Sequence, residues 1–121
     1  MSTTASRLDL DALTRAIEAR DAAGQLELYA DDAIVSVVDR DHGPSTPLEF
    51  KGRDEIGAFL EDVFGREITH KVERAVNDGP GAAYVLGCEY PDGTRVRCIA
   101  VLDVRDGLIV RQDGVQAWDA A

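Results

Sequence analysis

The amino-acid sequence predicts one α+β domain in which helices pack on one face of a curved β-sheet. Apolar residues in the first half recur at the three- and four-residue spacing of helices, whereas residues 67–118 form four strand-like runs separated by short turns. Helices followed by a meander of hairpins are typical of α+β domains. A chain of 121 residues is long enough for one core, and it shows no internal repeat and no domain boundary.

Two short helices are expected near the start. The first places Leu10, Leu13 and Ile17 on one face and has Asp9 as its N-cap. The second covers residues 21–30, where Asp21 is the candidate cap. Residues 1–7 have no apolar run and are expected to be a disordered lead-in to a domain over residues 8–119.

A strand is expected over residues 33–38, because this run is rich in β-branched side chains. The polar residues 39–50 are expected to form a loop, and a third helix begins after Gly52 with an apolar face of Ile56, Phe59, Leu60, Val63 and Phe64. Asp39, Asp41, His42 and Glu49 could form a rim to a site, and the alternative is an ordinary surface loop.

The turns of the second half fall at residues 77–80, 91–93 and 105–107, each of which contains glycine. Turns this short imply antiparallel hairpins. Side chains alternate between the two faces of each strand, and the inward set of residues 94–104 is Val96, Cys98, Ala100, Leu102 and Val104.

The outward face of the same strand also carries apolar side chains, at Ile99 and Val101. A sheet with one solvated face would be polar there. Val115 and Ala117 share the outward parity on the last strand, so a homodimer through the outer sheet face is expected. A monomer with scattered exposed aliphatic residues is the alternative.

The last strand has an unusual inward set, namely Gln112, Gly114, Gln116 and Trp118. Two amides and a glycine would not pack a dry core, because buried amides need hydrogen-bond partners. Such a face suits the wall of a cavity that holds water or a ligand. Alternatively, the two glutamines satisfy neighbouring backbone groups.

The charge balance excludes several partners. The chain has 13 Lys and Arg against 23 Asp and Glu, a formal net charge of −10. Such a surface repels nucleic-acid phosphates and anionic lipids, so neither a nucleic acid nor a membrane is an expected partner. No apolar run approaches the ~20 residues of a membrane span. Two cysteines make no disulfide framework, which favours the cytoplasm.

Five local strings in their order and spacing resemble one known family. They are YADDA at 29–33, GRDEIGAF at 52–59, EYPDG at 89–93, DGLIV at 106–110 and QAWD at 116–119. Together they resemble the nuclear-transport-factor-2-like superfamily, in particular its SnoaL-like domains, over about residues 8–119. The resemblance implies three N-terminal helices packed on a strongly curved mixed β-sheet, a cone with an internal pocket that often dimerises.

The resemblance also indicates which reactions of the family lack their catalytic residues in this sequence. The catalytic positions of the ketosteroid isomerases fall on Leu13, Val37, Leu60 and Ala100, and the acid/base position of the epoxide hydrolases falls on Gly114. Proton transfer needs a titratable group and an oxyanion needs donors, so neither mechanism is expected. Whether the protein is an enzyme is left open.

His70 is the candidate catalytic residue, because Ile68 and Val72 at strand spacing place it on the inward face. The alternative is a structural histidine bonded to a backbone carbonyl. Cys88 and Cys98 also point inward from adjacent strands, and either could be activated by His70 only if the strands bring them together; otherwise both are small buried hydrophobes. Two distant histidines give no metal-site spacing, so no metal and no cofactor are expected.

The predicted ligand pocket comprises Tyr29, Tyr84, Cys88, Cys98, Gln112, Gln116 and Trp118. Its mainly aliphatic surroundings favour a small apolar or polycyclic ligand. Two other functions stay open: an acid–base enzyme of the cyclase, isomerase or dehydratase type that uses His70, and a non-enzymatic dimerisation or assembly module.

Overall fold

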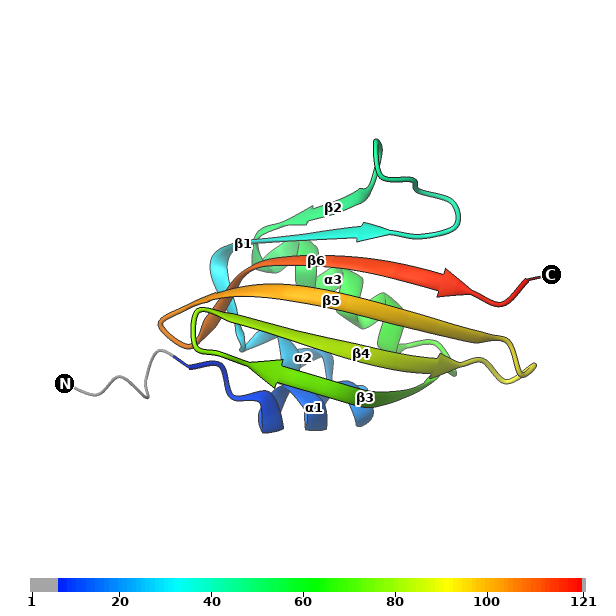
Figure 1. Cartoon of the computed structure of the whole chain (residues 1–121), viewed down its shortest axis with the longest axis horizontal. Helices are drawn as coiled ribbons and strands as arrows, with labels where there is room; N and C mark the ends of the chain where they lie inside the picture. Colours follow the sequence, from blue (N-terminus) through cyan, green and yellow to red (C-terminus); the bar gives the residue numbers. More distant parts are fainter. Residues whose placement is uncertain (1–6, 121) are drawn as a thin grey trace.

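The computed structural model describes residues 7–120 and contains one six-stranded mixed sheet in the order β2–β1–β6–β5–β4–β3 (Figure 1). The strands are β1 (Tyr29–Val38), β2 (Leu48–Lys51), β3 (Thr69–Asn77), β4 (Gly81–Glu89), β5 (Arg95–Arg105) and β6 (Leu108–Trp118). Strand β1 runs parallel to β6, and the other neighbours are antiparallel. The predicted mixed sheet and its late hairpins are confirmed.

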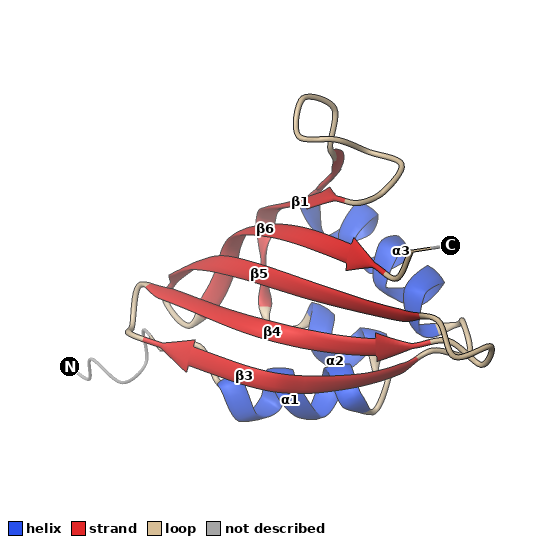
Figure 2. Ribbon diagram, turned by 45° about the vertical axis from the view of Figure 1, so that its right-hand side comes forward, coloured by secondary structure: helices blue, strands red, loops and turns tan. Residues whose placement is uncertain are grey.

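Three helices cover one face of the sheet and leave the other bare (Figure 2). They are α1 (Leu10–Glu18), α2 (Ala22–Leu26) and α3 (Gly52–Phe64). Helix α1 packs on β3, whereas α3 packs on β1 and β2. The helices therefore rest mainly on the two margins of the sheet, and the central strands β6, β5 and β4 face the interior between them.

The expected helix caps are present. The Asp9 carboxylate accepts a hydrogen bond from the Ala12 amide at 3.0 Å, and the Asp21 carboxylate accepts one from the Gly24 amide at 3.0 Å. Each satisfies a backbone donor that has no partner inside the helix, which fixes where α1 and α2 begin.

The second helix is shorter than predicted and the following strand is longer. Helix α2 ends at Leu26, and β1 already begins at Tyr29, which pairs with Ile109 of β6. Partners 80 residues along the chain decide this boundary, so local spacing could not locate it. The 39–50 segment is also not all loop, because residues 48–51 form β2 and pair with residues 34–37.

A left-handed backbone is needed at the Asp106–Gly107 turn and at the junction of β2 with α3. Asp106 and Gly107 have φ of 56° and 78°, the pair of positive values that a type I′ hairpin turn needs. Gly52 has φ of 82° where β2 passes into α3, a conformation that glycine adopts without strain. The turn at Asp106–Gly107 was predicted from its Asp-Gly sequence.

Bulges bend the sheet around the interior. In the pair β3–β4 the register shifts at Glu73 of β3, and in the pair β5–β6 it shifts at Val110 of β6, opposite Asp103 and Val104. A bulge adds one residue to one strand of a pair and increases the local twist and bend. These bulges and the twist between strands produce the strongly curved sheet that was predicted.

The predicted faces of β5 are confirmed. Val96, Ala100, Leu102 and Val104 are buried on the helix side. On the other side, Ile99, Val101 and Val115 are each more than half exposed, at 51%, 55% and 56%. Of the lead-in expected over residues 1–7, only Arg7 lies within the described residues. No helix in residues 7–120 is both long enough and apolar enough to cross a membrane.

Candidate functional site

A cavity of about 690 Å³ lies between the helices and the central strands. Its wall is mainly apolar, with residues from α3, β1, β4, β5 and β6. Of the residues predicted for the ligand pocket, six line it: Tyr84, Cys88, Cys98, Gln112, Gln116 and Trp118. His70 and Gly114 line it as well.

A relay of hydrogen bonds runs along one wall of this cavity. Gln25 Nε2 donates to the Tyr29 hydroxyl at 3.2 Å, and that hydroxyl donates to Gln112 Oε1 at 2.5 Å. Gln112 Nε2 then donates to the Tyr84 hydroxyl at 3.3 Å. Gln112 therefore uses both ends of its amide, and Tyr84 keeps its own hydroxyl proton for another acceptor.

Tyr29 lies one layer beneath the cavity lining. Its side chain is only 1% exposed, and it reaches the cavity through Gln25 and Gln112, which both line it. Burial raises the pKa of Tyr29 to about 12. Burial also raises the pKa of Tyr84 well above its ordinary value, so both phenols keep their protons at neutral pH.

His70 lies directly opposite Cys88 in the pairing of β3 with β4. Its Nδ1 is 3.2 Å from Cys88 Sγ. Nε2 of the same ring is buried and has no hydrogen-bond partner among the described residues. The Phe64 ring meets the imidazole edge-on, with centroids 5.4 Å apart. Within residues 7–120, the hydrogen bonds of His70 include none to a backbone carbonyl and none from Gln112 or Gln116.

The two cysteines have opposite tendencies to ionise. Hydrogen bonding from the Cys98 thiol, together with His70, lowers the pKa of Cys88 despite the cost of burial. The interaction with Cys88 and burial raise the pKa of Cys98. Within residues 7–120, no group of three or more His, Cys, Asp or Glu side chains is arranged to hold a metal ion.

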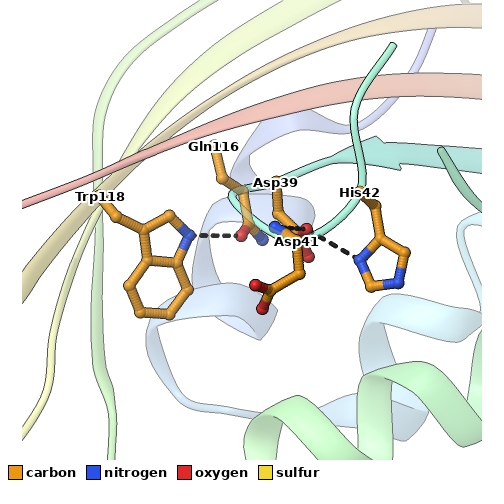
Figure 3. A network of polar contacts seen from close by, with 5 residues as sticks. All are labelled: Asp39, Asp41, His42, Gln116 and Trp118. Atoms are coloured by element: carbon orange, nitrogen blue, oxygen red, sulfur yellow. Dashed lines mark hydrogen bonds and ion pairs between the residues drawn. The ribbon is translucent and has the colours of Figure 1, made fainter. Parts of the chain in front are cut away.

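Aromatic and amide groups surround the end of the cavity nearest to the C-terminus. Trp118 Nε1 donates to Gln116 Oε1 at 3.1 Å (Figure 3). The Arg40 guanidinium lies 4.0 Å from the centroid of a Trp118 ring, and the Tyr90 ring packs on the same indole at 5.6 Å. A cation held over indole attaches the 39–47 loop to β6.

The first residues of that loop are held by their own hydrogen bonds. Asp39 Oδ1 accepts from the Asp41 amide at 2.9 Å and lies 2.9 Å from His42 Nδ1 (Figure 3). Burial alone would raise the pKa of Asp39, but these bonds, with one from the His42 amide, outweigh it and lower the pKa. Asp39 and Glu49 line the cavity. Of the four residues considered for a rim, these two therefore reach the site.

The positions that the family resemblance assigned to catalysis are apolar in space as well. Val37, Leu60, Ala100 and Gly114 all line the cavity, whereas Leu13 is buried in the core. An isomerase-type base or an epoxide-hydrolase-type acid would have to sit where these side chains lie. The structure supplies no carboxylate there.

Sequence reasoning missed Gln25 and Arg40. Gln25 is 3% exposed in a five-residue helix, and its Oε1 has no partner among the described residues. The available signal was its place four residues before Tyr29 in a polar-capped segment. No local signal indicates Arg40, because its partner Trp118 is 78 residues away.

Comparison with known proteins agrees with this architecture. The family model for the SnoaL-like domain matches residues 10–112. A nuclear-transport-factor-2-like protein of unknown function from Mesorhizobium loti superposes with a TM-score of 0.78 at 18% identity, covering 89% of this chain and 87% of that one. No curated protein matches the sequence.

Two similar structures concern steroid ligands. A protein from Mycobacterium tuberculosis, solved in complex with estradiol-17β-hemisuccinate, superposes with a TM-score of 0.67 at 23% identity, over 87% of this chain and 88% of that one. A computationally designed 17-OHP binder has a TM-score of 0.66 at 23% identity, over 91% and 90% of the two chains. At these identities the likeness establishes the fold.

Proposed function

The chain belongs to the family of SnoaL-like domains, and from that premise we propose that it binds a small apolar, polycyclic molecule inside its cavity. The observation that carries this proposal is an apolar cavity of about 690 Å³ in whose wall the Tyr84 hydroxyl keeps its proton free for an acceptor. Ligand sites of this kind are largely apolar and hold a few placed polar groups that orient the ligand.

The Tyr84 donor indicates the polarity that the ligand should have. Gln112 occupies the acceptor side of the Tyr84 hydroxyl, so the hydroxyl can give its proton to a ligand oxygen. The ligand therefore carries a carbonyl, ether or hydroxyl oxygen on an otherwise apolar skeleton. The steroid-type molecules bound by two proteins of similar fold have this character, which supports the proposed class.

The direct test is a titration with estradiol-17β-hemisuccinate, followed by thermal unfolding and by the fluorescence of Trp118, the single tryptophan. A ligand that binds only the native state at about 100 times its Kd stabilises that state by about 2.7 kcal/mol, which raises Tm. Polyketide-like and terpenoid compounds complete the panel. If none of the three classes changes Tm or fluorescence at millimolar concentration, the proposal is wrong.

Two leucine variants on β6 separate cavity binding from surface binding. A Cβ at Gly114 would meet nothing closer than the Ile99 carbonyl at 3.8 Å, so Gly114→Leu adds a side chain to the cavity without backbone strain. The matched control is Ala117→Leu, which adds the same group on the exposed face. We expect Gly114→Leu to abolish the Tm shift and Ala117→Leu to retain it.

A second candidate function is acid–base catalysis by His70. The observation that favours it is the unpartnered Nε2 of a buried imidazole at the cavity wall. A substrate group at that nitrogen would exchange a proton with it. If His70→Asn kept full activity on an established substrate, this candidate would be excluded. The open cavity argues against a purely structural assembly module, for which a filled interior would suffice.

We also propose that the protein is a homodimer through the outer sheet face. The outer apolar patch consists of Ile99, Val101 and Val115 with the adjoining Ala83 and Val85. At its borders, Arg97 pairs with Glu73 and Arg111 pairs with Asp113. An apolar centre with a polar rim is the usual anatomy of a protein interface.

The remaining proposals concern extent, location and partners. The domain covers residues 8–119, supported by a family match over 10–112 and by strand β6, which ends at Trp118. The net charge of −10 supports a chain that does not bind nucleic acid. Two free thiols support a reducing, cytoplasmic location. Neither proposed function requires a cofactor.

A further inference from the structure

Three strands bring two thiols and one imidazole together at the cavity wall. His70 of β3 is paired directly with Cys88 of β4. Cys88 is paired with Val96 of β5, so Cys98 lies two residues further along the same face. His70, Cys88 and Cys98 all line the cavity, and none of them takes part in the hydrogen-bond relay through Tyr29, Gln112 and Tyr84.

A β-bulge in β3 brings His70 next to Cys88. From Asn77 to Arg74, β3 pairs with β4 in one register, and from Val72 to Thr69 in a register shifted by one residue. Without the shift, His70 would lie opposite Glu89 and its side chain would point to the outer face. The extra residue, Glu73, therefore turns the imidazole inward onto the Cys88 sulfur.

The contacts of Cys88 are those of an activated nucleophile. Its Sγ is 3.2 Å from His70 Nδ1, which is within reach for proton transfer from thiol to imidazole. The Cys98 thiol and His70 both stabilise the thiolate, while Glu73 opposes it. Arg97 lies 3.4 Å from Glu73 and offsets part of that negative charge.

A second, independent observation points to a reacting partner at this wall. The His70 side chain is 9% exposed, yet its Nε2 has no hydrogen-bond partner among the described residues. Buried imidazole nitrogens are normally satisfied by protein or by an ordered water. A ring that contacts a thiol through one nitrogen and has no partner for the other can accept a proton and later return it.

We infer that Cys88 is a nucleophile that captures α,β-unsaturated carbonyl compounds in the cavity, with His70 as its proton acceptor and donor. The Cys88 proton passes to the imidazole, and the thiolate forms an S–C bond with the β-carbon. The C=C π bond breaks, and its electron pair moves through the α-carbon onto the carbonyl oxygen as an enolate. The imidazolium returns the proton to the α-carbon, so thiol and alkene become a saturated thioether.

The chemistry of the wall favours this class of electrophile. A thiolate is a soft nucleophile that adds readily to conjugated carbon, and the addition releases no leaving group. The surrounding apolar wall accommodates the carbon skeleton. The inference rests on the proposed function only in that the same cavity holds the compound.

The test uses 2-cyclohexen-1-one as the probe and intact mass with peptide mapping as the readout. We expect one adduct, on Cys88, that forms at pH 6.5 at least about tenfold faster than with N-acetylcysteine, because more of the sulfur is thiolate. Cyclohexanone, which lacks the double bond, forms no adduct. A rate no greater than that of N-acetylcysteine, or preferential modification of Cys98, overturns the inference.

Single substitutions test the roles of Cys88 as the nucleophile and His70 as the proton acceptor and donor. Cys88→Ser removes the adduct, and Cys98→Ala slows its formation because one donor to the sulfur is lost. His70→Asn lowers the rate at pH 6.5 on the order of tenfold and moves the pH–rate profile to higher pH. An unchanged profile in a folded His70→Asn protein excludes His70. If that variant does not fold, the wild-type protein still provides a test. Its rate of adduct formation must reach half of its maximum at a lower pH than the rate of N-acetylcysteine does.

Different results would contradict the reversible binding function and the covalent capture by Cys88. If Cys88→Ser binds estradiol-17β-hemisuccinate while the wild-type protein forms no enone adduct, the covalent inference alone is wrong. If the adduct forms but no saturated ligand shifts Tm in either protein, the reversible binding function alone is wrong. Saturation of the cavity with a reversible ligand should protect Cys88 from the enone.

Discussion

The hydroxyl of Tyr29 donates a 2.5 Å hydrogen bond to Oε1 of Gln112, which links the beginning of β1 to the middle of β6 across 83 residues of sequence. Both side chains are buried, and their strands are the one parallel pair in the described sheet. This bond fixes the amide of Gln112 and thereby directs its Nε2 at Tyr84. The polarity of the cavity wall depends on this contact.

Tyr29→Phe should lower the free energy of unfolding by about 1–3 kcal/mol, because it leaves Gln112 Oε1 buried without a donor. Gln25 Nε2 loses its acceptor in the same variant. Urea denaturation followed by circular dichroism measures the change. Tyr90→Phe, at a partly exposed tyrosine of the cavity lining, is the matched control and should cost less. Equal losses in the two variants would contradict a structural relay.

The free energy of unfolding should fall above pH 10, because Tyr29 and Tyr84 are buried in the native state. The pKa of Tyr29 is raised from 10.0 to about 12, so above pH 10 the unfolded chain releases its phenolic proton while the native state retains it. The stabilisation is complete below pH 10 and is lost as the pH rises towards 12, at about 1.4 kcal/mol per pH unit for each such group.

Urea denaturation at pH 9, 10 and 11 tests this slope. Tyr29→Phe should flatten part of the decline, and the raised pKa of Tyr84 should account for a further part. A wild-type protein whose stability is constant from pH 9 to 11 would show that the two phenols ionise as freely in the folded state as in the unfolded chain.

Tyr84→Phe should weaken oxygen-bearing ligands selectively. The variant keeps the ring but removes the hydroxyl proton offered to the ligand, and we expect about a fivefold increase in Kd. A hydrocarbon ligand with the same skeleton and no oxygen should bind both proteins equally. Trp118 fluorescence provides the readout. Equal weakening of both ligands would mean that the ring, and not the hydroxyl, contacts them.

A charge in the outer apolar patch should dissociate the proposed dimer. Ile99 and Val115 are opposite each other on β5 and β6 and are both more than half exposed. Val115→Lys would bury an unpaired charge in the interface, so sedimentation velocity should show a shift from dimer to monomer mass.

The control for the interface is Leu108→Lys. Leu108 is also an exposed apolar residue of β6, but it lies about 23 Å from Val115 along the strand. This variant should keep the dimer. A wild-type protein that sediments as a monomer at every concentration would contradict the interface outright.

Local sequence patterns were enough to predict the three helices, the late hairpins and the two faces of β5. The caps at Asp9 and Asp21, the Asp106–Gly107 turn and the alternation along β5 are local properties, and each is as expected. The apolar nature of the family's catalytic positions was also readable, because single residues at matched positions decide it.

The contacts between polar groups depend on how distant strands pair. The parallel pairing of β1 with β6 brings Tyr29 to Gln112, and no spacing within either segment encodes that contact. The bulge at Glu73 decides that His70 faces Cys88, since a shift of one residue exchanges the two faces of a strand. Local patterns fix which way a side chain alternates, whereas register between distant strands follows from the packing of the whole sheet.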